Sequence, residues 1–469
     1  MQNLPKEIFK AYDIRGIVGK TLTPEIVELI GHALGSEAKA RLQTDICIGY
    51  DGRLSGPELA SALSRGIRSA GVNVVNLGMV ATPMVYFAAH YLKTNCGVMV
   101  TGSHNPPDYN GLKMVLASET LAMDAIQSLR SRIEHNSFTY GEGLERNYEI
   151  VDDYNSAITN DIKLARPMKI TVDCGNGVAG AFAKRLYKSI GCGVDELFCE
   201  VDGHFPNHHP DPSVPENLAD LITQLQTSDA EIGLAFDGDG DRLGVVTKDG
   251  QIIYPDRQLL LFAEDVLSRN VGATIIYDVK STRNLNPWIR QNNGIPIMWK
   301  TGHSLVKAKI KETNAALAGE MSGHVFFNDS DAQGKKRWYG FDDGLYAGAR
   351  LLEILSRFEN PTDILNNLPD SVSTPEQHIH MQEGEPHALI AQLQAMPNVL
   401  GTFTGATEII TIDGLRVEYA DGFGLMRPSN TTPVIVLRFE ADTQTALTRI
   451  QAQFKEIIWN VAPHLELPF

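Results

Sequence analysis

The chain has 469 residues, of which 43% are hydrophobic and 21% charged, and its formal net charge is −16. This composition is typical of a globular protein with a large core, and at roughly 100–200 residues per domain the length predicts two to four domains. Because the chain is acidic and has no block of like charges, we expect neither nucleic acid nor an anionic membrane as a partner.

The cysteine pattern and the hydropathy of the chain indicate where in the cell the protein is expected. The chain has five cysteines and no C-x-x-C pair, which is typical of reduced, structural thiols in a cytoplasmic protein. They are Cys47, Cys96, Cys174, Cys192 and Cys199. The N-terminal residues lack the apolar stretch of a signal peptide. No apolar run approaches the roughly 20 residues that a membrane span needs.

Three units of similar pattern follow one another along the chain. Each has a Val- and Ile-rich strand, a polar loop with an aspartate (Asp51, Asp173 or Asp278), a helical pattern, a glycine and a second strand. Such a crossover predicts that the two strands pair in parallel. Each unit then continues with another apolar strand that ends in a polar loop.

The repeat predicts an α/β protein with three similar mixed α/β domains, followed by a smaller C-terminal α+β domain. We expect the domains to cover residues 1–148, 149–251, 252–364 and 365–469. Because α/β domains bind ligands at the carboxyl ends of parallel strands, each of the first three is expected to contribute one loop to a site.

The first of these loops is Thr101-Gly-Ser-His-Asn-Pro-Pro. Glycine lets the backbone approach a ligand closely and the prolines stiffen the exit from the loop. Ser103 is therefore well placed for covalent chemistry, with His104 beside it. The α/β-hydrolase pattern G-x-S-x-G is not matched, which argues against acyl transfer. The alternative is a polar turn without chemistry.

The second loop, which runs from Asp237 to Arg242, is the sharpest signal. Asp237, Asp239 and Asp241 repel one another unless a cation gathers them, and an all-oxygen site favours Mg²⁺ or Ca²⁺ over zinc. An EF-hand is excluded because Arg242 and Lys248 occupy the positions that require Gly and Glu. Two alternatives to a metal site remain. One is an aspartyl-phosphate phosphatase, which also has an Asp-x-Asp loop after a strand, and the other is an acidic surface turn without a function.

Residues 175–180 match the dinucleotide-binding pattern G-x-G-x-x-G, with Glu200 near the distance expected of a ribose-binding acid. This pattern supports a nicotinamide-dependent oxidoreductase as a rival interpretation. The segment is, however, the second copy of a unit whose other two copies lack the glycines. Glycine-rich first turns are also common in α/β folds.

Two later loops carry hydrogen-bonding groups. Residues 319–324, Gly-Glu-Met-Ser-Gly-His, offer a carboxylate, a hydroxyl and an imidazole, a mixture that suits vicinal sugar hydroxyls. Residues 427–433, Arg-Pro-Ser-Asn-Thr-Thr-Pro, offer a guanidinium beside hydroxyl and amide groups, which is typical of a phosphate-binding loop.

In this order and spacing, the loops TGSHNP, DGDGDR, GEMSGH and RPSNTTP resemble those of the α-D-phosphohexomutase superfamily, in particular its bacterial phosphomannomutase/phosphoglucomutase group. The resemblance extends from FKAYDIRG near the N-terminus to the Arg427 loop. It implies four domains around one central cleft. It also implies a cytoplasmic enzyme of carbohydrate metabolism that serves nucleotide-sugar and polysaccharide biosynthesis, as a monomer or a weak dimer.

The resemblance implies roles for individual residues. Ser103 would carry the phosphoryl group, and a phosphate oxygen on Ser103 would bind Mg²⁺ together with the three aspartates. Lys113 and Arg242 would lie near the reacting oxygen, with His104 beside the serine. The implied substrate contacts are Tyr12, Arg15, Arg257, Lys280, His303, Glu320, Ser322, His324, Arg427, Ser429, Asn430 and Thr431.

The implied reaction is the reversible conversion of hexose 1-phosphate and hexose 6-phosphate, of mannose, glucose or both. Phosphoserine and a hexose 1,6-bisphosphate, as intermediate and activator, would take part in it. A phosphoglucosamine mutase is the alternative within the class, although such enzymes more often have Gln where Met321 stands. Outside the class, the alternatives are a metal-dependent sugar phosphatase, a nicotinamide-dependent oxidoreductase and a non-enzymatic sugar-phosphate binding protein.

Overall fold

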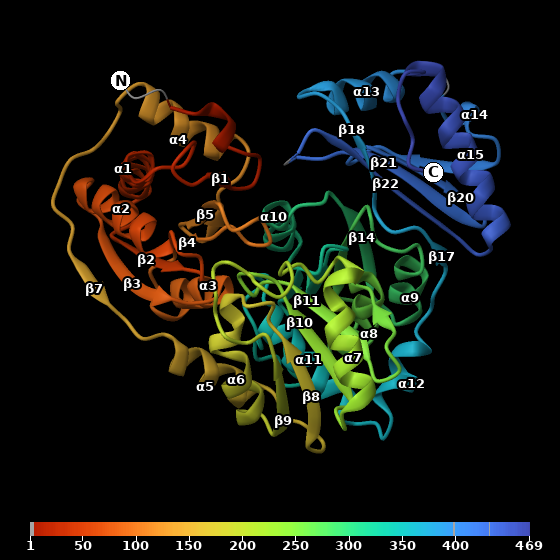
Figure 1. Ribbon diagram of the computed structural model, residues 1–469, viewed down its shortest axis with the longest axis horizontal. Helices are drawn as coiled ribbons and strands as arrows, with labels where there is room; N and C mark the ends of the chain where they lie inside the picture. Colours follow the sequence, from red (N-terminus) through yellow and green to blue (C-terminus); the bar gives the residue numbers. More distant parts are fainter. Residues whose placement is uncertain (1–3, 397–398, 431) are drawn as a thin grey trace.

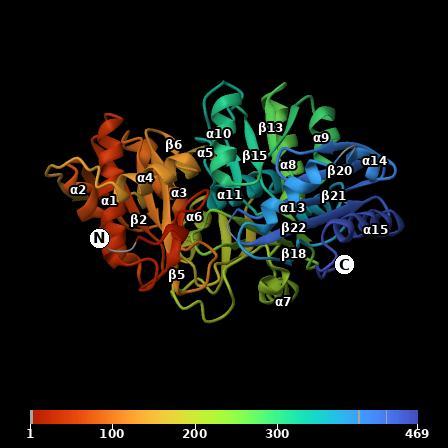
Figure 2. The same ribbon diagram turned by 90° about the horizontal axis from the view of Figure 1, so that it is seen from above.

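A computed structural model describes residues 4–396, 399–430 and 432–469 of the chain. Four β-sheets, each with its own helices, follow one another along the sequence (Figure 1). The first domain and the C-terminal domain lie at opposite sides of the molecule, with the second and third between them, and the view from above shows the same order (Figure 2).

The first domain is built on a seven-stranded sheet. Its strands are β1 (Ile14–Ile17), β2 (Asp45–Tyr50), β3 (Asn73–Met79), β4 (Gly97–Val100), β5 (Tyr109–Leu116), β6 (Glu119–Thr120) and β7 (Glu145–Asn147). Its helices are the short 3₁₀ turn Lys6–Ile8 and α1 (Pro24–Ala40), α2 (Gly56–Ser69), α3 (Thr82–Tyr91) and α4 (Asp124–Glu134). Helix α1 begins at Pro24, because the Thr23 hydroxyl accepts a hydrogen bond from the amide of Ile26 and proline is favoured at the first helical position.

The second domain has a five-stranded sheet. Its strands are β8 (Met168–Asp173), β9 (Cys192–Leu197), β10 (Ile232–Phe236), β11 (Leu243–Thr247) and β12 (Ile252–Ile253). Its helical segments are α5 (Val151–Asp161), the 3₁₀ turns Val178–Ala181 and Pro215–Leu218, α6 (Ala183–Ser189) and α7 (Ala219–Thr227).

The third domain has a four-stranded sheet. Its strands are β13 (Thr274–Asp278), β14 (Ile295–Trp299), β15 (Leu317–Gly319) and β16 (Val325–Phe327). Its helices are α8 (Pro255–Arg269), α9 (Leu285–Gln291), α10 (His303–Thr313), α11 (Gly344–Leu355) and α12 (Pro361–Asn366).

The predicted repeat is present in the topology. The strand orders β3-β2-β4-β5, β9-β8-β10-β11 and β14-β13-β15-β16 are the same, with the first three strands of each set parallel and the fourth antiparallel. The parallel crossover expected from the sequence is therefore confirmed in all three domains. The strands β4, β10 and β15, which occupy the same position in the three sheets, end at the three predicted loops.

The C-terminal domain has a different, six-stranded sheet. Its strands are β17 (Val372–Ser373), β18 (Gln377–His380), β19 (Ala406–Ile410), β20 (Leu415–Tyr419), β21 (Gly422–Pro428) and β22 (Val434–Ala441), and its helices are α13 (Glu385–Gln394), α14 (Val399–Thr402) and α15 (Gln444–Val461). All pairings that the structure describes in this sheet are antiparallel, as expected of an α+β domain.

Apolar packing joins the first three domains into one body. One hydrophobic cluster includes Tyr86 of α3, Tyr154 of α5, Phe236 of β10 and Leu345 of α11. The C-terminal domain has its own core, and ionic contacts attach it to the third domain: the Arg438 guanidinium lies 2.9 Å from the Asp256 carboxylate. Within the described ranges, no helix is long and apolar enough to cross a membrane.

Candidate active site

The Ser103 loop follows β4, the Asp237 loop follows β10, and Glu320 comes directly after β15. Contacts join these loops across domain boundaries. The Ser103 hydroxyl donates a hydrogen bond to the Asp237 carboxylate, and Arg242 Nε lies 3.4 Å from His324 Nε2. The similar ends of the three sheets therefore meet in one place, as their shared pattern predicts.

Ser103 is almost fully buried, with 1% of its surface exposed, and its backbone has a φ of 50°, in the left-handed region. Its Oγ lies 3.1 Å from Asp237 Oδ2 and 3.3 Å from His104 Nδ1. Burial and the nearby cations Arg242 and Arg15 lower the pKa of His104 well below its usual value. These surroundings therefore favour the neutral form of the imidazole beside the hydroxyl.

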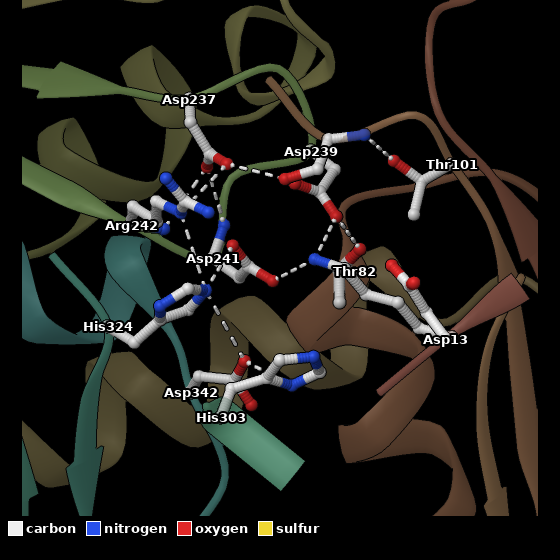
Figure 3. Close-up of polar contacts among 12 residues, drawn as sticks. Asp13, Thr82, Thr101, Asp237, Asp239, Asp241, Arg242, His303, His324 and Asp342 are labelled. Atoms are coloured by element: carbon white, nitrogen blue, oxygen red, sulfur yellow. Dashed lines mark hydrogen bonds and ion pairs between the residues drawn. The ribbon is translucent and has the colours of Figure 1, made fainter. Parts of the chain in front are cut away.

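Asp237, Asp239 and Asp241 are fully buried and lie in one cluster (Figure 3). Asp237 Oδ1 accepts hydrogen bonds of 3.1 Å from the amides of Asp241 and Arg242, which curls the loop. Lys113 of β5 forms ion pairs with Asp239, at 2.8 Å, and with Asp241. Each of these two carboxylates so binds the ammonium through Oδ2.

The cluster fits a bound cation. Among the described residues, no group forms a hydrogen bond with Oδ1 of Asp239 or Asp241, although both atoms are buried. One ligand oxygen from each of the three aspartates lies within 4.8 Å of the others. Burial and the charges of Asp239 and Asp241 raise the pKa of Asp237 well above its usual value. A divalent cation would bind these two oxygens and relieve the repulsion among the three carboxylates.

The surroundings of Lys113 favour its protonated form. Burial alone would lower the pKa of its ammonium, but Asp239 and Asp241 outweigh burial and raise the pKa above its usual value. The ammonium form therefore neutralises part of the carboxylate charge and holds its proton tightly.

The third loop forms the opposite side of the site (Figure 3). His324 lies 3.4 Å from Asp241 Oδ1 through Nε2, and its Nδ1 lies 2.9 Å from the Ser322 hydroxyl. The His303 ring stacks on that of His324, with 5.5 Å between centroids. Glu320 is buried and accepts a hydrogen bond from the amide of Gly302, and burial raises the pKa of this carboxyl.

The C-terminal domain contacts the same region, where its Asn430 meets Tyr12 of the first domain. The Tyr12 hydroxyl donates to the carbonyl of Thr301 at 2.9 Å and accepts a hydrogen bond from the Asn430 amide. Asp413 accepts hydrogen bonds of 3.0 Å from both Arg427 Nε and the amide of Thr301. These contacts bring the first, third and fourth domains together at the loop predicted to bind phosphate.

Three further predicted site residues contact neighbouring parts of the chain. Arg15 donates to the carbonyl of Gly102 at 3.1 Å and to the Asn105 side chain, so it lies on the serine loop. Lys280 is buried and forms a 2.5 Å ion pair with Glu376, which precedes β18. The Ser429 amide donates to the carbonyl of Val434 across the base of its loop.

Arg257 does not join this group. Its guanidinium donates to the carbonyl of Leu368 at 3.0 Å and pairs with Asp370 at 3.3 Å, both in the segment that leads to the C-terminal domain. These contacts join Arg257 to the segment that leads to the C-terminal domain, and its role as a substrate contact stays a prediction. Thr431 lies outside the described residues.

Three side chains of the site carried no signal in the sequence. Thr82, at the start of α3, donates a hydrogen bond to Asp239. Asp342 pairs with Lys307 at 2.8 Å and lies 3.4 Å from His303 Nδ1. Asp413 links Arg427 to Thr301. Each belongs to a different element from the loop it supports, so only the tertiary structure reveals its role.

The glycines of the dinucleotide-like segment serve internal packing. A Cβ on Gly177 would lie 2.9 Å from Gly238 Cα in the Asp237 loop, and one on Gly180 would lie 2.1 Å from the Cys199 carbonyl oxygen. Backbone of the same domain thus occupies the positions against the glycines where a pyrophosphate would approach.

Comparison with known proteins agrees with this architecture. Four family profiles match the chain in succession: phosphoglucomutase/phosphomannomutase alpha/beta/alpha domain I at residues 6–140, domain II at 152–250, domain III at 254–372, and the C-terminal domain at 379–457. The chain therefore belongs to the phosphoglucomutase/phosphomannomutase family, a group within the α-D-phosphohexomutase superfamily.

Individual relatives are similar over nearly their whole length. A phosphoglucomutase of Neisseria meningitidis serogroup A is 61% identical over 461 residues, which are 98% of each chain. A phosphomannomutase/phosphoglucomutase of Pseudomonas aeruginosa is 54% identical over 467 residues, 99% of this chain and 98% of that one. The crystal structure of a family protein from Burkholderia thailandensis has a TM-score of 0.93 and 57% identity, and the match covers 99% of this chain and 100% of that one.

Proposed function

We propose that this protein interconverts hexose 1-phosphate and hexose 6-phosphate, of glucose, mannose or both, by moving a phosphoryl group through Ser103. The observation that carries the proposal is the 3.1 Å contact between the Ser103 hydroxyl of the first domain and the Asp237 carboxylate of the second. This contact supports the proposal, because the hydroxyl that would carry the phosphoryl group lies beside a carboxylate that would bind the cation. We further propose that the enzyme acts as a monomer in the cytoplasm.

The cation would be Mg²⁺, held by Asp237, Asp239, Asp241 and an oxygen of the phosphate on Ser103. Hard oxygen ligands and an adjacent phosphate are typical of Mg²⁺ sites. When bound, the metal ion supplies neutralisation of the charge that develops on the transferring phosphoryl group. Lys113 and Arg242 contribute further positive charge at the same place, and preorganised charge of this kind is a large part of phosphoryl-transfer catalysis.

In the first transfer, a free hydroxyl of the hexose phosphate attacks the phosphorus on Ser103. A new bond forms between the sugar oxygen and phosphorus, and the bond from phosphorus to Ser103 Oγ breaks. The proton of the sugar hydroxyl ends on Ser103 Oγ, which becomes a free serine hydroxyl. The product is a hexose 1,6-bisphosphate. The intermediate then reorients in the site, and its other phosphate returns to Ser103 by the reverse of the same step.

The remaining residues suit a substrate that binds in two orientations. Glu320, Ser322 and His324 offer acceptors and donors for the central hydroxyls of the sugar. His303 and Lys280 extend this group on the third domain. Arg427, Ser429 and Asn430 would bind the phosphate that is not reacting, with Tyr12 and Arg15 beside them.

Replacing the carrier tests the proposal. Ser103→Ala should abolish both the isomerisation of glucose 1-phosphate and the uptake of radiolabelled phosphate from glucose 1,6-bisphosphate. Ser61→Ala, on the exposed face of α2 in the same domain, is the matched control and should retain both. Isomerisation by Ser103→Ala at the parent rate would contradict the proposal.

A further inference from the structure

Arg53 is a buried cation of the first domain to which the mechanism assigns no part. It lies at the carboxyl end of β2, in the sequence Asp51-Gly-Arg, and only 1% of its surface is exposed. Burying an arginine is unfavourable unless its charge and its donors are all engaged. Its partners therefore indicate what it does.

The guanidinium of Arg53 is bound to the backbone of the serine loop. Nη2 donates to the carbonyl of Ser103 itself at 2.8 Å and to that of Asn105 at 2.6 Å. Nη1 donates to the carbonyls of Pro106, at 2.5 Å, and Tyr109, at 3.0 Å. Four carbonyls within seven residues thus converge on one rigid, planar donor group.

Asp51 completes the arrangement from the other side. Its carboxylate lies 3.3 Å from Arg53 Nε and accepts hydrogen bonds from the Thr101 hydroxyl, at 2.7 Å, and the Gly102 amide, at 3.3 Å. The Thr101 hydroxyl in turn accepts a hydrogen bond of 2.7 Å from the Ser103 amide. Asp51 therefore accepts hydrogen bonds from the loop before Ser103, and Arg53 donates hydrogen bonds to the carbonyls of Ser103 and of the residues after it.

The backbone of Ser103 needs this support. Its φ of 50° is uncommon for a residue other than glycine and costs free energy unless the surroundings impose it. The neighbouring glycine leaves room for the guanidinium, because a Cβ on Gly102 would lie 2.4 Å from Arg53 Cζ and Nε. The loop and the arginine are therefore fitted to each other.

The same arginine contacts the domain that carries the three aspartates. The Phe205 ring of the second domain lies 5.1 Å from Arg53 Cζ. Beside it, a Cβ on Gly203 would lie 3.0 Å from Arg53 Cα, and one on Gly52 would lie 2.3 Å from a Val201 methyl group. The turn that bears Arg53 is thus packed between the serine loop and the second domain.

We propose that Arg53, paired with Asp51, is a positioning residue for phosphoryl transfer, which holds the strained serine loop so that Ser103 Oγ faces Asp237. Arg53 does not touch the reacting atoms, because its donors go to backbone carbonyls. Its contribution is to keep the distance and direction between the carrier and the cation-binding group. This inference rests on the proposed function of Ser103.

The test compares Arg53→Lys with the parent chain. Lysine keeps the charge beside Asp51 but a single ammonium group cannot reach four carbonyls. We expect the rate of phosphate uptake from radiolabelled glucose 1,6-bisphosphate, in a single turnover, to fall about 100-fold, the scale of a misplaced reacting group. The kcat should fall likewise, whereas KM for glucose 1-phosphate should change little because the substrate contacts lie on other residues.

Arg350→Lys is the matched control. Arg350 is equally buried, pairs with Asp329 at 2.8 Å and lies in α11, away from the serine loop. Arg350→Lys should lower the midpoint of thermal unfolding as Arg53→Lys does, but its rate of phosphate uptake should equal that of the parent chain. Parent-like uptake by Arg53→Lys, or an equal loss in Arg350→Lys, would overturn the inference.

A second variant leaves the arginine in place. In Gly102→Ala the added methyl group must displace the guanidinium, so we expect the same loss of phosphate uptake. This variant provides the test if Arg53→Lys does not fold. Parent-like uptake by Gly102→Ala would contradict the inference. Absence of uptake by the parent chain would instead contradict the proposed function, so the two failures are distinguishable.

Discussion

At the scale of single residues, the aspartate loop was the most predictable part of the site. Three carboxylates in five residues, separated by glycines, indicate a cation from sequence alone, and the structure buries all three together. Their partners were less predictable. Lys113 was expected from the resemblance alone, and Thr82, which donates to Asp239, was not expected at all. Neither lies near the loop in sequence.

Asp239→Asn tests the proposed cation-binding group. The variant replaces one carboxylate oxygen with an amide, so the affinity for Mg²⁺ should fall and activity should drop by about 10²–10³-fold, the scale of losing one charge-stabilising group. Titration calorimetry with Mg²⁺ measures the affinity, and added Mg²⁺ should restore part of the activity. Asp229→Asn, an exposed carboxylate of the same domain, is the control. Unchanged Mg²⁺ affinity in Asp239→Asn would contradict the assignment.

At the scale of elements, apolar periodicity and crossovers were enough to predict the repeated parallel strands. Short or exposed strands were not predictable in this way. Strand β7, Glu145–Asn147, has three exposed residues and exists because β3 offers it an edge. Helix starts depended on single side chains. Helix α11 begins at Gly344, directly after Asp343, whose carboxylate accepts hydrogen bonds from the Tyr346 amide at 2.9 Å and the Tyr154 hydroxyl at 2.8 Å.

The Asp343 cap should make stability depend on pH. Burial raises the pKa of this carboxyl from 3.8 to about 7. Between these values the folded chain binds one more proton than the unfolded chain, so its stability should fall as the pH rises toward 7 and level off above it, by at most about 1.4 kcal/mol per pH unit.

Asp343→Asn keeps an acceptor for Tyr346 but does not titrate. We expect its unfolding midpoint, compared with that of the parent, to rise as the pH goes from 5 to 7. Thermal unfolding measured across that range checks this, with the exposed Asp363→Asn as the control. A constant difference between Asp343→Asn and the parent would refute the prediction.

At the scale of the whole molecule, the site exists only because four domains meet. The sequence could predict that three similar loops share a site, since each follows the same strand of its sheet. It could not predict which side chains meet across domains. Tyr12 and Asn430 are 418 positions apart, and their contact depends on how the C-terminal domain is attached.

Tyr12→Phe tests the junction between the first, third and fourth domains. It removes the hydroxyl that donates to Thr301 and accepts from Asn430. With about 1 kcal/mol lost for a hydrogen bond, kcat/KM should fall by about 5- to 10-fold, and hydrogen exchange around Asn430 should quicken. Tyr419→Phe, which loses a hydrogen bond to Gln453 within the C-terminal domain, should leave both parent-like. No change in Tyr12→Phe would mean that the junction has no part in turnover.

A pulse–chase measurement tests the central claim most directly. The chain is first loaded with radiolabelled phosphate from glucose 1,6-bisphosphate and then mixed with excess unlabelled glucose 1-phosphate in a rapid-quench apparatus. The account predicts that label leaves Ser103 and appears first in the bisphosphate and then at the 6-position of glucose 6-phosphate. Label released as inorganic phosphate, or label that remains on the protein while glucose 6-phosphate forms, would contradict it.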